Sequence, residues 1–286
     1  MKAWPTVPPR APKLVLMVMV KRPWKVKFAA TRPSIETRGM TGTPTLTGYV
    51  HSFQVGSAVD GPGIRAVVFL AGCPLRCQYC HNPDSWDRHH GQAMSSVELM
   101  KLLKRYEKPL KMGKGGVTLT GGEPLMQHKF ARSILHQCKA LALHTALDTS
   151  GYLGAKLSDP DLLDIDLMLL DLKAGDPDTC LRVTGHELQP TLDFAKRLSR
   201  LNRPTWVRFV LVPGLTDAPD HVARVADLAA SIRSLERVEV LPFHQMGRDK
   251  WQRLGLDYAL ADVNPPDPET LARTRAIFEA RGLAVY

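Results

Sequence analysis

Three cysteines lie within eight residues of this chain, in the segment Cys73-Pro-Leu-Arg-Cys77-Gln-Tyr-Cys80. A structural zinc site normally takes four ligands, so His81 or His89 would have to supply the fourth. A cluster of four irons held by three thiolates instead leaves one iron open to a substrate. The spacing therefore indicates a metal centre, and it favours an iron–sulfur cluster over zinc.

The other two cysteines, Cys138 and Cys180, lie far from this segment and have no cysteine near them in the sequence. We interpret both as ordinary, partly buried thiols. Five cysteines placed so unevenly do not form a disulfide framework. They indicate a reducing compartment, and we expect the protein to be cytoplasmic.

Short apolar runs alternate with amphipathic stretches after residue 65, which is the pattern of repeated βα units. We predict strands over Ala66–Leu70, Gly116–Thr120, His144–Asp148, Leu167–Leu172, Thr205–Val212 and Val238–Pro242. We predict helices over Lys129–Leu141, Leu188–Leu201, Pro219–Leu235 and Pro268–Arg281, and a helix start with a capping box at Ser95 and Glu98.

Five further motifs follow the predicted strands. They are GGEP (121–124), DTSG (148–151), DLK (171–173), VPG (212–214) and FHQMG (243–247). Ligands of parallel α/β folds bind at the carboxyl ends of the strands, so these motifs and the cysteine segment should share one rim. Six strands with intervening helices predict an α/β fold, with a full or partial TIM-like barrel.

Charge is distributed unevenly along the 286 residues, whose formal net charge is +10. Residues 1–47 carry nine Lys or Arg and one acid, whereas the rest carries 29 basic and 27 acidic groups. The nearly neutral body argues against a nucleic-acid partner. The apolar run Leu14–Val20 is far shorter than the about 20 residues that span a bilayer, so we expect no membrane association.

Residues 1–46 are rich in proline as well as in basic residues, and we interpret them as a poorly ordered extension. One alternative is that the chain starts at Met40 and that the preceding residues are a start-site artefact. The prediction is a single domain over residues 47–286.

The segment Asp60-Gly61-Pro62-Gly63-Ile64-Arg65, followed by Phe69, Gly72, the three cysteines and Asn82, resembles the signature of radical S-adenosylmethionine (radical SAM) activating enzymes. The resemblance continues through YVHSF (49–53), TLTGGEPL (118–125), LDTSGY (147–152), MLLDLK (168–173), VRFVLVPGLTD (207–217), LPFHQMGRDKW (241–251) and NPPDPE (264–269). It covers about residues 48–286. The pattern is closest to enzymes that activate pyruvate formate-lyase.

This resemblance implies a partial (β/α)6 barrel of the radical SAM type. It implies reductive cleavage of S-adenosylmethionine to methionine and a 5′-deoxyadenosyl radical, which takes a hydrogen atom from a glycine of pyruvate formate-lyase or of a related glycyl radical enzyme. Flavodoxin or ferredoxin would be the reductant. No catalytic acid or base is expected.

The resemblance also assigns site residues. Cys73, Cys77 and Cys80 would hold one 4Fe–4S cluster. The residues that would bind S-adenosylmethionine are Tyr79, Cys80, His81, Gly122, Asp171, Leu172, Lys173 and His244. Asp148, Thr149 and Asp171 resemble a monovalent-cation site, and we expect Arg65 to help neutralise the anionic assembly of cluster and ligand.

Two alternatives remain at this point. One is the activating enzyme of a different glycyl radical enzyme. The other is a catalytically silent zinc-binding relative that kept the barrel. Residues 78–120 contain no cysteine except Cys80, so we expect no accessory cluster.

Overall fold

The computed structural model describes residues 45–286. The predicted extension over residues 1–46 therefore lies almost wholly outside the described residues, and its boundary stays a prediction. The first described strand begins at Thr47.

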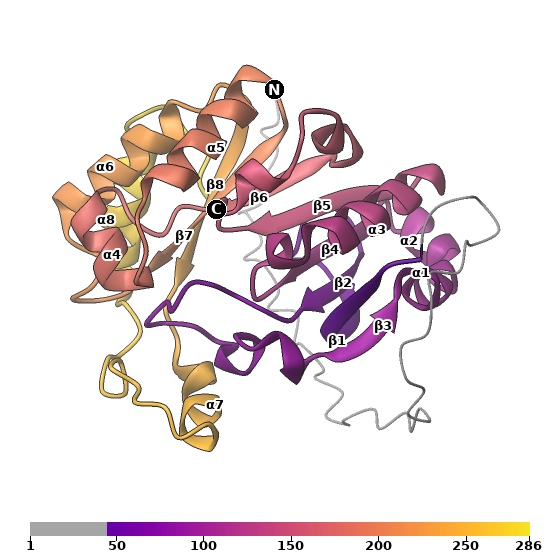
Figure 1. Ribbon diagram of the computed structural model, residues 1–286. Helices are drawn as coiled ribbons and strands as arrows, with labels where there is room; N and C mark the ends of the chain where they lie inside the picture. The colour runs from indigo at the N-terminus through magenta and orange to yellow at the C-terminus, as the bar shows by residue number, and fades with distance from the viewer. Residues whose placement is uncertain (1–44) are drawn as a thin grey trace, which may run out of the picture. The chain divides into compact units, whose positions relative to one another are not determined.

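The described residues form one sheet of eight strands (Figure 1). The strands are β1 (Thr47–Ser57), β2 (Arg65–Leu70), β3 (Gln92–Ser95), β4 (Gly116–Gly121), β5 (His144–Thr149), β6 (Leu167–Asp171), β7 (Thr205–Leu211) and β8 (Leu235–Pro242). Their order is β3-β1-β2-β4-β5-β6-β7-β8. Six strands pair in parallel, namely β2, β4, β5, β6, β7 and β8. Strands β1 and β3 extend the sheet beyond β2 as antiparallel strands. The α/β fold with a partial barrel is confirmed.

Helices connect the strands and cover the outer face of the sheet. They are α1 (Ser96–Lys104), α2 (Glu107–Met112), α3 (His128–Ala140), α4 (Pro177–Thr184), α5 (Gln189–Arg200), α6 (Pro219–Ala230), α7 (Arg248–Arg253) and α8 (Pro268–Glu279). In Figure 1, α1 to α3 flank the part of the sheet that contains β4 and β5, and α4, α5, α6 and α8 flank the part that contains β7 and β8. Helix α7 lies apart from both groups.

The apolar side chains of these helices build the main core against the outer face of the sheet. Leu99 of α1, Ile134 of α3, Phe194 of α5, Val225 of α6 and Phe278 of α8 are all buried in it. Because each helix presents one apolar stripe at helical spacing, the sheet can bury its outer face along its full width. No helix within residues 45–286 has both the length and the apolar content to cross a bilayer.

The inner face of the barrel is polar around its middle. Arg208 of β7 donates to Asp148 of β5 at 3.1 Å and to Glu239 of β8 at 2.9 Å. Asp148 also accepts from Thr120 of β4 at 2.7 Å. These bonds join four strands across the inside of the sheet.

The free edge of β8 is covered by the last residues of the chain. Val238 donates its main-chain N–H to Ala284 at 2.8 Å, and Val240 donates to Tyr286 at 3.0 Å. Exposed edges can pair with other chains, so this short pairing protects the sheet from edge-to-edge association.

Candidate active site

The cysteine segment forms a loop that leaves the carboxyl end of β2. Cys77 and Tyr79 are buried in a second apolar cluster, and Cys73 and Cys80 pack against it from the rim. All five cysteines of the chain are free thiols. Burial raises the pKa of Cys77 to about 12, and it also raises the pKa values of Cys73 and Cys80. The three thiols therefore stay protonated unless a metal centre takes up their sulfur atoms.

Main-chain hydrogen bonds hold this loop from two sides. The N–H groups of Arg76 and Gln78 donate to the carbonyls of Thr184 and Val183, at 2.8 and 3.0 Å. On the other side, the Glu123 N–H donates to the carbonyl of Gly72 at 2.7 Å. The loop is thus fixed between the end of α4 and the GGEP turn.

The GGEP turn follows β4 and approaches the cysteine loop closely at Gly122. A Cβ atom at this position would lie 2.4 Å from the Gly72 carbonyl oxygen, so only glycine fits. The next residue, Glu123, is buried and accepts from the Thr149 hydroxyl at 2.7 Å and from the Ser150 hydroxyl at 2.6 Å. Glu123 therefore ties the end of β4 to the end of β5.

The DLK motif lies at the end of β6 and contains a half-buried ion pair. Lys173 Nζ lies 2.6 Å from an Asp171 carboxylate oxygen and 5.6 Å from the centre of the Tyr79 ring. Burial alone would lower the pKa of Lys173, but the Asp171 carboxylate outweighs it and raises that pKa well above its usual value. The Leu172 side chain lies in the main core, so a ligand could meet this residue only at its main chain.

Two histidines stack beside the loop. The rings of His81 and His244 are 4.0 Å apart and inclined by 21°. Burial, with the neighbouring His244 as a second cause, lowers the pKa of His81 to about 4. His81 is therefore neutral at physiological pH, and its ring presents a flat, uncharged surface.

Several buried polar atoms of this rim lack a hydrogen-bond partner among the described residues. They include the Tyr79 hydroxyl, His81 Nε2 and Asp148 Oδ1. Buried polar groups are nearly always satisfied in native proteins. These three atoms consequently mark a region where a polar ligand is expected.

The residues predicted to bind a monovalent cation have partners of their own. Asp148 is bound by Arg208 and Thr120, and the Thr149 hydroxyl donates to Glu123. Burial raises the pKa of Asp148 to about 6, although Arg208 opposes that shift. The Asp148 and Asp171 carboxylates are left as the available oxygen ligands, and the cation site stays a prediction.

Comparisons with known proteins agree with this geometry. The model of the radical SAM superfamily matches residues 67–229. Pyruvate formate-lyase 1-activating enzyme of Escherichia coli (strain K12) is 39% identical over 242 residues, which cover 83% of this chain and 98% of that protein. Pyruvate formate-lyase-activating enzyme of Clostridium pasteurianum is 42% identical over 224 residues, 78% of this chain and 94% of that protein. The chain belongs to the pyruvate formate-lyase-activating enzymes of the radical SAM superfamily.

Solved structures of two further proteins share the fold. Streptococcus suis SuiB bound to its precursor peptide SuiA gives a TM-score of 0.58 at 16% identity and covers 77% of this chain and 48% of that chain. A radical SAM methyltransferase from Sphaerobacter thermophilus gives 0.54 at 15% identity, over 89% of this chain and 76% of that chain.

The donor set of this radical SAM chain fits a 4Fe–4S cluster, the family's cofactor together with S-adenosylmethionine. Among residues 45–286, no three His, Cys, Asp or Glu side chains come close enough to hold one metal ion. A zinc ion needs all its ligand atoms within about 2.3 Å of one point. A four-iron cluster offers a separate iron to each thiolate, so its three sulfur ligands lie further apart.

One expectation about this radical SAM site is wrong. Arg65 lies at the amino end of β2, whereas the cysteine loop follows the carboxyl end. The Arg65 side chain is fully buried and donates to the Thr118 hydroxyl at 3.0 Å and the Val117 carbonyl at 2.7 Å. It closes the opposite end of the barrel and does not neutralise the cluster.

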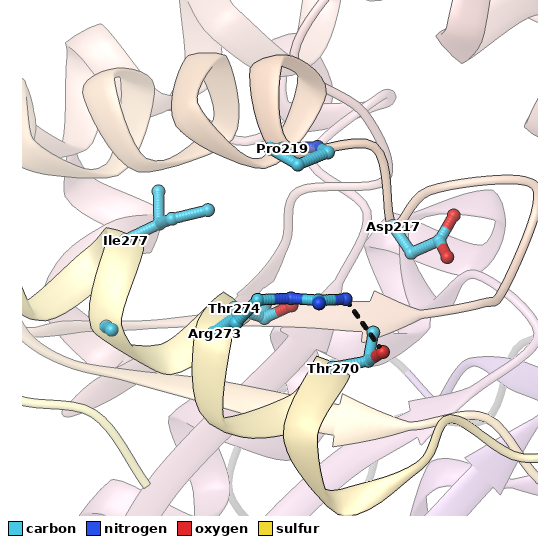
Figure 2. A pocket seen from close by; sticks show the side chains of 7 residues that line it. Asp217, Pro219, Thr270, Arg273, Thr274 and Ile277 are labelled. Carbon is cyan, nitrogen blue, oxygen red and sulfur yellow. Dashed lines mark hydrogen bonds between the residues drawn. The ribbon is translucent and has the colours of Figure 1, made fainter.

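A cavity of about 260 Å³ lies away from the predicted site, between the start of α6 and α8 (Figure 2). Asp217 and Pro219 line one side, and Thr270, Arg273 and Ile277 line the other. Arg273 donates to the Thr270 hydroxyl at 3.1 Å. None of the residues predicted to bind the cluster or S-adenosylmethionine lines this cavity.

Proposed function

We propose that this protein cleaves S-adenosylmethionine reductively at a 4Fe–4S cluster held by Cys73, Cys77 and Cys80, and so generates the glycyl radical of pyruvate formate-lyase. The bound cluster would supply one electron to the sulfonium, so that its bond to C5′ breaks and gives methionine and a 5′-deoxyadenosyl radical. This radical would take a hydrogen atom from a glycine of the partner and leave as 5′-deoxyadenosine. The observation that carries the proposal is the set of three free, largely buried thiols on one loop. The same rim has buried polar atoms that lack a hydrogen-bond partner among the described residues. The identity to named activating enzymes supports the choice of partner.

In this proposal the residues of the rim bind and orient S-adenosylmethionine. Lys173 pairs with its carboxylate, and the main chain at Gly122 accepts a hydrogen bond from its amino group. The flat faces of His81 and His244 line the adenosine pocket together with Tyr79. Each of these residues follows a strand end or lies on the cysteine loop, which explains how distant segments contribute to one site.

Exclusion of water is the second task of the site. Apolar side chains surround the cysteine loop, among them Leu75, Val212 and Phe243, which are all buried. A dry environment protects a reactive radical from side reactions. We infer that Asp148 and Asp171 can add a monovalent cation beside the ligand carboxylate.

We infer the partners and the location from the same chemistry. A reductant such as flavodoxin or ferredoxin supplies the electron, and the protein substrate is pyruvate formate-lyase or a related glycyl radical enzyme. Free thiols throughout the chain support a cytoplasmic location. The nearly neutral body supports the absence of a nucleic-acid or membrane partner.

Cleavage of S-adenosylmethionine tests the role of the three cysteines. After anaerobic reconstitution and reduction, we expect the unmodified protein to release 5′-deoxyadenosine and methionine in equal amounts, measured by liquid chromatography. Cys77→Ala should abolish this release because one iron loses its thiolate. Cys138→Ala, at a buried thiol of the main core, is the matched control and should retain cleavage. Full activity in Cys77→Ala would exclude the proposed cluster.

A further inference from the structure

Three aromatic rings cover the cysteine loop on the side of Cys80. Trp251 of α7 donates its indole N–H to the Cys80 carbonyl at 2.8 Å. The Trp86 ring meets Trp251 edge-on, with 5.1 Å between centres, and Tyr258 stacks on Trp251 at 5.0 Å with an angle of 29°. We call Trp86, Trp251 and Tyr258 the aromatic wall. Its members belong to the apolar cluster that contains the cysteines.

The Tyr258 hydroxyl is the unexplained group of this wall. The side chain is only 7% exposed, yet its hydroxyl has no hydrogen-bond partner among the described residues. A buried tyrosine hydroxyl normally finds a partner. The proposed roles of the rim residues do not use this group.

The position of Tyr258 is fixed by its surroundings. The Gln245 side chain donates to the carbonyls of Leu260 and Val263, both at 2.7 Å, and so holds the segment that carries Tyr258. The phenol O–H is a hydrogen-bond donor, and it has no acceptor among the described residues.

We propose that the Tyr258 hydroxyl donates a hydrogen bond to a sulfur atom on the Cys80 side of the 4Fe–4S cluster and thereby raises the reduction potential of the cluster. This inference rests on the proposed function. Hydrogen bonds to the sulfur atoms are one of the factors that set the potential of such clusters. The reduced cluster carries more negative charge, so a donor stabilises it more than the oxidised form. Tyr258 would thus tune electron transfer by direct contact with the cluster.

Tyr258→Phe removes the hydroxyl and keeps the ring that stacks on Trp251. In the anaerobically reconstituted variant, we expect the midpoint potential of the cluster to shift to a more negative value. Iron content and affinity for S-adenosylmethionine should stay unchanged. Pulsed electron paramagnetic resonance of the reduced cluster in H2O and D2O should show that one exchangeable proton coupling is lost. Tyr286→Phe, at a tyrosine that is 62% exposed at the chain end, is the control and should change neither quantity.

The possible outcomes separate this inference from the proposed function. If the unmodified protein assembles no 4Fe–4S cluster, the proposed function fails. If the cluster assembles normally and Tyr258→Phe changes neither its potential nor the exchangeable coupling, only the inference fails. Loss of iron from Tyr258→Phe would also overturn it, because the hydroxyl would then serve assembly of the site.

Discussion

Lys173 provides the positive charge that the rim offers to a ligand carboxylate. Its ammonium group is largely withdrawn from water and is balanced by Asp171 at 2.6 Å. Such an ion pair is stable when hydrogen bonds from its partners replace the lost water. A carboxylate of the ligand can bind the same ammonium group as well. His244 meets the site differently, through the flat face that stacks on His81.

Removal of either side chain should weaken binding of S-adenosylmethionine without loss of the cluster. A charged hydrogen bond contributes about 1.5–3 kcal/mol, so we expect Lys173→Ala to lower affinity roughly tenfold or more. We expect His244→Ala to weaken binding through lost ring contact. Calorimetric titration of the reconstituted proteins, with iron quantified in parallel, measures both effects. Lys196→Ala, on the exposed side of α5, should bind normally. Unchanged affinity in Lys173→Ala would remove this lysine from the site.

The sequence predicted the residues that lie in motifs, and it missed those whose role depends on the curvature of the partial barrel. The cysteines, Gly122 and Lys173 follow strand ends and are visible as motifs. Arg208 and Glu239 look like solvent-facing charges in an alternating strand, but the curved sheet turns them toward each other at 2.9 Å. Glu123 could have been noticed, since an acid directly follows two glycines at the end of a predicted strand.

At the scale of elements, Asp84 joins three parts of the chain beside the cysteine loop. It belongs to the 3-10 turn Pro83–Ser85. Its carboxylate lies 3.1 Å from His51 Nε2 of β1 and 3.0 Å from Lys250 Nζ of α7. Lys250 also donates to Asn82 at 2.7 Å. Although burial opposes ionisation, these partners lower the pKa of Asp84 to about 2.

Asp84→Asn should therefore destabilise the protein in a pH-dependent manner. Because the folded-state pKa of about 2 lies below the ordinary value of 3.8, the ionised carboxylate stabilises the fold above pH 3.8. This contribution is lost as the pH falls toward 2. The side chain is 32% exposed, so solvent screening limits the expected loss of unfolding free energy to about 1 kcal/mol at pH 7.

Urea unfolding of the protein without its cluster, at pH 7 and at pH 3, measures this difference in unfolding free energy, which should shrink at the lower pH. Glu107→Gln is a suitable control, since Glu107 and Lys111 form an exposed pair within α2. A difference for Asp84→Asn that is equal at both pH values would contradict the assignment to the ionised carboxylate.

The predicted strands of the parallel sheet all exist, because each carries apolar side chains that are buried in the main core against the helices. Strands β1 and β3 were missed. Strand β1 mixes buried and exposed positions irregularly, as expected near a sheet edge, and β3 has only four residues. Helices α4 and α7 have eight and six residues, too few to establish a helical period in the sequence.

The chain divides into two parts of different charge and composition, residues 1–47 and the remainder. The nine basic residues of residues 1–47 stand outside the motifs that this family shares, which lie within residues 48–286. We therefore expect a chain that starts at Met40 to assemble its cluster and cleave S-adenosylmethionine as the full chain does. Iron content and the rate of 5′-deoxyadenosine release provide the comparison. Loss of either would show that residues 1–39 contribute to the active protein.

Formation of a glycyl radical is the most direct test of the proposed function. The reconstituted, reduced protein is mixed anaerobically with S-adenosylmethionine and pyruvate formate-lyase, and the mixture is followed by electron paramagnetic resonance. We predict that a glycyl radical signal grows on pyruvate formate-lyase and that formate-lyase activity rises in proportion. A partner in which the reactive glycine is replaced by alanine should give no signal. If S-adenosylmethionine is cleaved and pyruvate formate-lyase still gains no radical, its proposed role as the substrate is contradicted.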